Sequence, residues 1–220
     1  MTRRVRAAMI CALVLAATAA PAEARSISAG ACVMKGVKLV DANAYVVVAE
    51  VPGDSPGHGK FYPGDRMMCD VAVGTWRVLA RTNIDPQYEI VRISGHFVGF
   101  SGRVFSCENC TGDDSFVGVK NAATGHTVFM RYMHLTDDQD VKGYAIPDMV
   151  LKPNGSVAFT VDGNWRHAWR SSRLVIKHDF CGGTQVLDKS KRHLRLRSLR
   201  RDGSQLRWRV GQRLRIATLC

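Results

Sequence analysis

Residues 194–216 read LRLRSLRRDGSQLRWRVGQRLRI, and apolar residues alternate with basic ones along most of this length. Successive side chains of a β-strand point to opposite faces, so a period of two predicts strands rather than a helix. Asp202-Gly203 and Gly211-Gln212 interrupt the alternation with residues typical of tight turns. The segment therefore predicts a three-stranded antiparallel meander over about residues 191–219.

Alternation would place the apolar side chains of this meander, Trp208 among them, on one face and the arginines on the other. The predicted polyanion face consists of Arg195, Arg197, Arg207, Arg209, Arg213 and Arg215. Arginine forms bidentate pairs with carboxylate and phosphate, so the partner expected for this face is an anionic cell-envelope polymer or polysaccharide. A solvated sheet edge, protected from aggregation by its charge, is the alternative interpretation. No aromatic residues are interleaved on the face, which argues against recognition of single-stranded nucleic acid. No sequence-specific nucleic acid partner is expected.

The net charge of +12 is concentrated in the same part of the chain. Residues 25–188 carry 17 basic and 17 acidic residues, whereas residues 189–220 carry eleven basic residues and a single acidic one, Asp202. The basicity is thus a property of one terminal segment rather than of the whole molecule, as expected of a charged interaction surface.

The remainder of the chain also predicts strands, because its short apolar blocks are bounded by Gly, Asn and Asp. Strands are expected at residues 37–50, 75–81, 88–93, 96–105, 115–119, 127–133, 149–151, 157–161, 174–177 and 184–187. Residues 52–66 and 135–148 predict loops, and no window predicts a long amphipathic helix. Residues 25–220 should therefore form a single all-β domain of antiparallel meanders and hairpins.

Two of the predicted hairpins lie in matching contexts, one at Asn154-Gly155 and the other at Asp202-Gly203. Both follow the pattern Leu, two residues, Asn or Asp, Gly, Ser, six residues, Gly, with a spacing of 48. That spacing is in the range of antiparallel repeats such as propeller blades. Residues 94–126 continue the rhythm of strand, turn and strand, and on these motifs residues 75–220 resemble the blades of secreted bacterial β-propeller-like repeat proteins.

The resemblance implies a bacterial, exported protein built from sheets that pack side by side. A closed propeller has about four to eight four-stranded blades, and this chain is long enough for about three or four. Packed propeller-like blades and a β-sandwich both stay open as arrangements of the predicted strands.

Residues 1–24 predict a cleaved signal peptide. Three arginines precede an apolar stretch at residues 7–20, and Ala22-Glu23-Ala24 offers small residues for cleavage. No later apolar run reaches about 18 residues, so the processed protein is expected to be secreted or extracytoplasmic and to have no membrane span.

Six cysteines follow the predicted signal peptide: Cys32, Cys69, Cys107, Cys110, Cys181 and Cys220. An even number in an oxidising compartment predicts three disulfides, although about 15 pairings exist. Nearest-neighbour pairing would join the first to the second, the third to the fourth and the fifth to the sixth. This pairing would tie Cys220, the last residue, to Cys181 and so limit fraying of the C-terminal strand.

Cys107-Glu-Asn-Cys110 has the spacing of a redox dithiol. Its acidic neighbours would disfavour a thiolate, and the residues that follow predict a turn instead of the helix that such a site needs. A structural disulfide is the preferred interpretation, and an exported thiol-disulfide oxidoreductase is the alternative.

Trp165 and Trp169 lie in a predicted loop or hairpin tip and are candidates for contact with a sugar or a partner protein. The alternative is that both cover a sheet edge. The acidic loop that begins at Asp137 lacks the ligands of a calcium loop, so neither a metal nor a cofactor is expected. There is no Gly-x-Ser-x-Gly motif, and a hydrolase would need catalytic residues that meet only in the fold. A non-enzymatic binding module or envelope-associated protein is therefore preferred.

Overall fold

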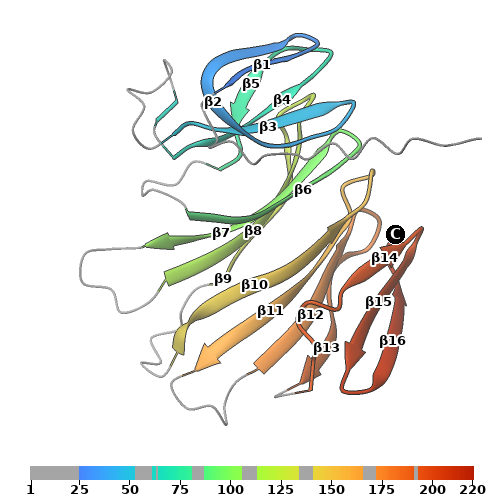
Figure 1. Ribbon diagram of the computed structural model, residues 1–220. Coiled ribbons are helices and arrows are strands. Elements are labelled where there is room, and N and C mark those ends of the chain that lie inside the picture. The colour runs from blue at the N-terminus through green and yellow to red at the C-terminus, as the bar shows by residue number, and fades with distance from the viewer. Residues whose placement is uncertain are drawn as a thin grey trace, which may run out of the picture.

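The computed structural model describes residues 25–52, 61–62, 64–80, 87–105, 113–133, 141–165, 172–190 and 193–220. Across these residues the secondary structure is strand, turn and bend, without a helix, and the strands form four antiparallel sheets. The predicted all-β class is confirmed. Figure 1 shows the sheets arranged in chain order, from the blue first sheet to the red last one.

Each sheet is a meander in which strands adjacent in sequence are adjacent in space. The first sheet contains β1 (Arg25–Ala29), β2 (Cys32–Ala42), β3 (Val46–Glu50), β4 (Arg66–Asp70) and β5 (Trp76–Val78). The second contains β6 (Gln87–Ser94), β7 (Phe97–Phe105), β8 (Asp113–Asn121) and β9 (Thr127–Met133). The third contains β10 (Val141–Leu151), β11 (Val157–Trp165), β12 (Ser172–Asp179) and β13 (Gly183–Ser190). The fourth contains β14 (Arg200–Asp202), β15 (Gln205–Val210) and β16 (Arg213–Thr218).

Three hydrophobic clusters join consecutive sheets, and the alternation of side chains explains how. On β8, Phe116 belongs to the cluster shared with the first sheet, whereas Val117 and Val119 belong to the cluster shared with the third. On β12, Ile176 faces the second sheet and Val175 faces the fourth. The second and third sheets are thus covered on both faces, which is why their central strands carry consecutive apolar residues, as in Phe116-Val117 and Ala158-Phe159.

Two strand predictions need correction at their boundaries. Residues 37–50 form parts of two strands, because Asn43 makes a turn in which its side-chain oxygen accepts hydrogen bonds from the backbone N–H groups of Tyr45 and Val46, both at 2.8 Å. Residues 141–148, predicted as loop, belong to β10. A register shift between Ala145 and Asp148 accommodates Pro147, which has no N–H for the ladder.

The hairpins at Asn154-Gly155 and Asp202-Gly203 are confirmed, but their turn type differs from the one that the dipeptides favour. Only the glycines take positive φ, 88° for Gly155 and 54° for Gly203. Gly203 is the first residue of a two-residue loop, as in a type II′ turn. Gly155 ends a three-residue loop that Gly155 N and Lys152 O close at 3.0 Å.

A common hydrogen bond recurs in all four sheets, beyond the two sequence contexts that predicted a repeat. In each sheet the acceptor is the residue immediately before one strand, namely β3, β7, β11 or β15. The donor is the backbone N–H of a residue just after the strand that follows, namely β4, β8, β12 or β16. The pairs are Val71 N to Tyr45 O at 2.8 Å, Ala122 N to His96 O at 2.8 Å, Phe180 N to Ser156 Oγ at 3.0 Å and Leu219 N to Ser204 O at 2.9 Å. The four sheets therefore share this contact, with a backbone oxygen as acceptor in three of them and the Ser156 hydroxyl in the third sheet.

Two of the predicted disulfides are confirmed. Cys32 pairs with Cys69 and Cys181 pairs with Cys220, with Cα atoms 6.0 and 6.3 Å apart. Cys107 and Cys110 lie outside the described residues, as does the predicted signal peptide. Within the part of the chain that the structure describes, no helix is long and apolar enough to cross a membrane.

Candidate functional site

The C-terminal meander is confirmed, but its register does not place the arginines on one face. Trp208 of β15 lies opposite Arg215 of β16, and Arg209 lies opposite Leu214. Residues opposite one another in an antiparallel pair project to the same side of the sheet. The tight turn at residues 211–212 pairs Val210 with Arg213, so the apolar positions of one strand meet the basic positions of the next.

The prediction that the apolar residues of the meander all pack in the core is correct for β15 and wrong for β16. Leu206 is fully buried and Trp208 is 3% exposed, whereas Leu214 and Ile216 are 52% and 58% exposed. The indole Nε1 of Trp208 donates a hydrogen bond to Asp188 Oδ2 on β13 at 3.0 Å. The last sheet thus has an outer face on which exposed leucine and isoleucine lie among arginines.

The first strand of the meander begins later than the alternation predicts. Leu194 forms an isolated bridge with Val210, and Arg195 N donates to Arg209 O at 2.9 Å, but regular pairing resumes only at Arg200. The intervening residues leave the ladder. As a result, Arg197 lies away from the outer face of the sheet, beside β6 and β10.

Most of the predicted polyanion-face arginines have no carboxylate partner. Arg207 pairs with Asp202 at 3.4 Å and Arg215 approaches Asp188 at 3.9 Å. Among the described residues, no ion pair is formed by the other four, which are Arg195, Arg197, Arg209 and Arg213. All four are exposed, so their positive charge is directed to solvent.

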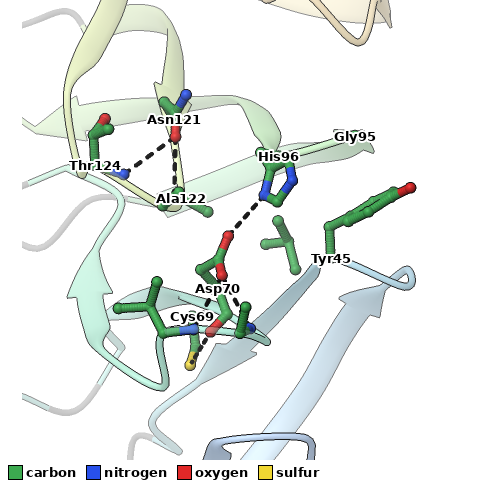
Figure 2. Close-up of polar contacts among 12 residues, drawn as sticks. Tyr45, Cys69, Asp70, Gly95, His96, Asn121, Ala122 and Thr124 are labelled. Atoms are coloured by element: carbon green, nitrogen blue, oxygen red, sulfur yellow. Dashed lines mark hydrogen bonds and ion pairs between the residues drawn. The ribbon is translucent and has the colours of Figure 1, made fainter.

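A second polar site, which the sequence analysis missed, lies where the first sheet meets the second. Figure 2 shows the carboxylate of Asp70, at the end of β4, directed toward His96 in the turn between β6 and β7. Asp70 Oδ2 lies 2.7 Å from His96 Nδ1, and Asp70 Oδ1 accepts hydrogen bonds from Ala72 N at 3.0 Å and Val73 N at 3.2 Å. The ring of Tyr45 contacts the imidazole with centroids 4.7 Å apart.

The electrostatics of Asp70 favour its charged form. Burial raises the pKa of this 1% exposed residue, but the hydrogen bonds from His96, Ala72 and Val73 outweigh burial and hold the pKa below its ordinary value of 3.8. Among the described residues, no hydroxyl or thiol hydrogen-bonds to His96. Within the described parts of the chain the pair thus has no triad nucleophile bonded to it, and it joins the two sheets.

This geometry predicts how stability depends on acid. A carboxyl group whose pKa is lower in the folded state stabilises that state above its unfolded pKa, about 4, and the stabilisation disappears as the pH falls through the folded pKa. We expect Asp70→Asn to flatten the decline in the free energy of unfolding below about pH 4. Urea denaturation at several pH values measures this decline in the free energy of unfolding. Asp41→Asn, on the exposed part of β2, is the control. An equal decline in the parent and both variants would contradict the assignment.

The remaining predicted site residues fall partly outside the described residues. Trp165 ends β11, but its side-chain placement and all of Trp169 lie outside them. The same holds for the Cys107-Cys110 pair. Within the described parts, no group of three or more His, Cys, Asp or Glu residues could hold a metal ion.

No protein-family description matches the chain, and a search of curated proteins finds no similar sequence.

Proposed function

We propose that the protein is an exported, non-enzymatic binding module that uses its C-terminal arginines to bind anionic polymers of the cell envelope. The observation that carries this proposal is the set of four exposed arginines without a carboxylate partner. Unneutralised like charges repel one another and oppose compact folding, so an anionic ligand would relieve a cost that the free protein carries.

Two further observations support the proposal. The two disulfides favour an oxidising, extracytoplasmic location, because such bonds rarely persist in a reducing cytosol. The repeated meander and its recurring hydrogen bond favour a propeller-like stack over a two-sheet sandwich, since clusters join each sheet to the next one along the chain. Proteins built in this way offer long composite surfaces for binding.

A triple variant tests the proposal. We expect Arg195→Gln, Arg209→Gln and Arg213→Gln together to reduce the slope of log affinity for heparin against log salt by about one for each arginine lost. Titration calorimetry over a range of NaCl concentrations measures the slope. The substituted side chains are exposed, so the melting temperature should stay near that of the parent.

The matched control removes three exposed basic residues elsewhere, through Lys35→Gln, Lys38→Gln and Arg131→Gln. Both variants lose the same formal charge. If they weaken heparin binding equally, net charge alone is responsible and the C-terminal site is wrong.

A further inference from the structure

The first strands of the second and third sheets, β6 and β10, border a groove together with residues 196–201, which lead into β14. β6, β10 and β14 are each an edge strand of their own sheet. A hollow of 710 Å³ is bounded by residues 89–90, 145–147 and 196–197, among others, and a second of 370 Å³ by residues 92–94, 148–151 and 199–201. The two hollows occupy consecutive stretches of the same three segments. Along β10 they cover seven residues, or about 20 Å of extended chain.

The carboxylates of this groove are already paired. Glu89 contacts Arg103 at 2.7 Å, and Asp162 contacts Arg173 at 3.3 Å. Asp148 accepts a hydrogen bond from Leu199 N at 3.1 Å and contacts Arg200 at 3.4 Å. These acidic groups therefore do not neutralise the rest of the lining.

Three arginines of the lining form no ion pair among the described residues. Arg92 donates to the backbone oxygen of Val91 at 3.0 Å, and Arg201 donates to that of Gly203 at 3.0 Å. Arg197 is exposed and has no hydrogen bond or ion pair within the described structure. The lining of the first hollow has two arginines against two carboxylates, and that of the second has three arginines against one. The surplus of positive charge therefore lies in the second hollow, and Arg197 is the arginine of the first hollow that forms no ion pair among the described residues.

The composition of the lining distinguishes between kinds of anionic chain. The described lining has no aromatic side chain on which the bases of a nucleic acid could stack. An acidic polysaccharide carries carboxylates for the arginines and hydroxyl donors for Glu89 and Asp162, since an ionised carboxylate accepts several hydrogen bonds. Mixed basic and acidic lining thus matches a ligand with both anionic and hydroxyl groups.

We infer that this groove binds an extended polyuronate, with Arg197 and Arg92 contacting its carboxylates in the two hollows. The inference rests on the proposed function and deepens it, because it names the ligand class and a groove that shares only Arg197 with the four exposed arginines.

Titration calorimetry with a short oligogalacturonate tests the groove. We expect Arg92→Gln with Arg197→Gln to weaken binding about tenfold or more, because both contacts are charge-assisted. The matched control, Lys35→Gln with Lys38→Gln on the exposed part of β2, loses the same charge outside the groove and should weaken binding by no more than about twofold. The single variant Arg197→Gln provides a second measurement if the double variant fails to fold, and it should weaken binding as well.

The outcomes separate the groove from the wider function. Equal weakening by both double variants, or binding of heparin but not of oligogalacturonate, would overturn the groove while leaving the polyanion function standing. Binding of single-stranded oligonucleotide that depends on Arg92 and Arg197 would replace the polyuronate with nucleic acid. Failure of the parent to bind any of these anions at low salt would overturn both proposals.

Discussion

Trp208→Ala should lower the free energy of unfolding by about 3–5 kcal/mol. The Trp208 side chain is 3% exposed and packs with Leu194, Leu199 and Leu206 between the third and fourth sheets. Truncation would leave a cavity there. Asp188 would also lose the hydrogen bond that it accepts from the Trp208 indole at 3.0 Å. Urea denaturation followed by circular dichroism measures the change.

Leu214→Ala is the control for this substitution, because Leu214 lies in the adjacent strand but is 52% exposed. We expect it to cost less than about 1 kcal/mol. A larger loss for Leu214→Ala than for Trp208→Ala would show that β16, rather than β15, packs against the core, and the observed register would be wrong.

Removal of the Cys32–Cys69 disulfide should cost a similar amount. The bond connects residues 37 positions apart, and closing a loop of that size in the unfolded chain stabilises the folded state by about 4 kcal/mol. Both cysteines are fully buried in the hydrophobic cluster of the first sheet, so a Cys32→Ala, Cys69→Ala variant also loses packing. Urea denaturation under non-reducing conditions measures the loss.

The Cys181–Cys220 bond offers a comparison with a loop of nearly the same size, at a separation of 39 residues. Cys181 is exposed and Cys220 is partly exposed, so a double alanine variant there loses the cross-link with less packing. We expect the Cys32–Cys69 variant to be the less stable of the two. The reverse order would contradict the importance of burial in the first sheet.

The fold class could be predicted because alternation and turn residues are local signals. The hairpins at Gly155 and Gly203 and the meander at the C-terminus are confirmed for this reason. β4 was missed because Met67, Met68 and Cys69 form a short apolar block beside a region rich in Pro and Gly. A strand buried on both faces shows no alternation, and this block was its only signal.

The arrangement of the site depends on information that alternation does not carry. Each of β15 and β16 alternates correctly, yet the turn between them sets the register, and the register decides which arginines share a face. The contact of Asp70 with His96 spans 26 residues and two sheets. Likewise, the groove joins Arg92 to Arg197 only because β6, β10 and residues 196–201 lie together.

The affinity of the oxidised full chain for heparin, measured from low to physiological salt, tests most directly whether the protein binds anionic polymers. We expect binding at low salt and a linear fall of log affinity with log salt, because each neutralised anionic group releases a counterion. Absence of binding at low salt, or an affinity that does not change with salt, would contradict it.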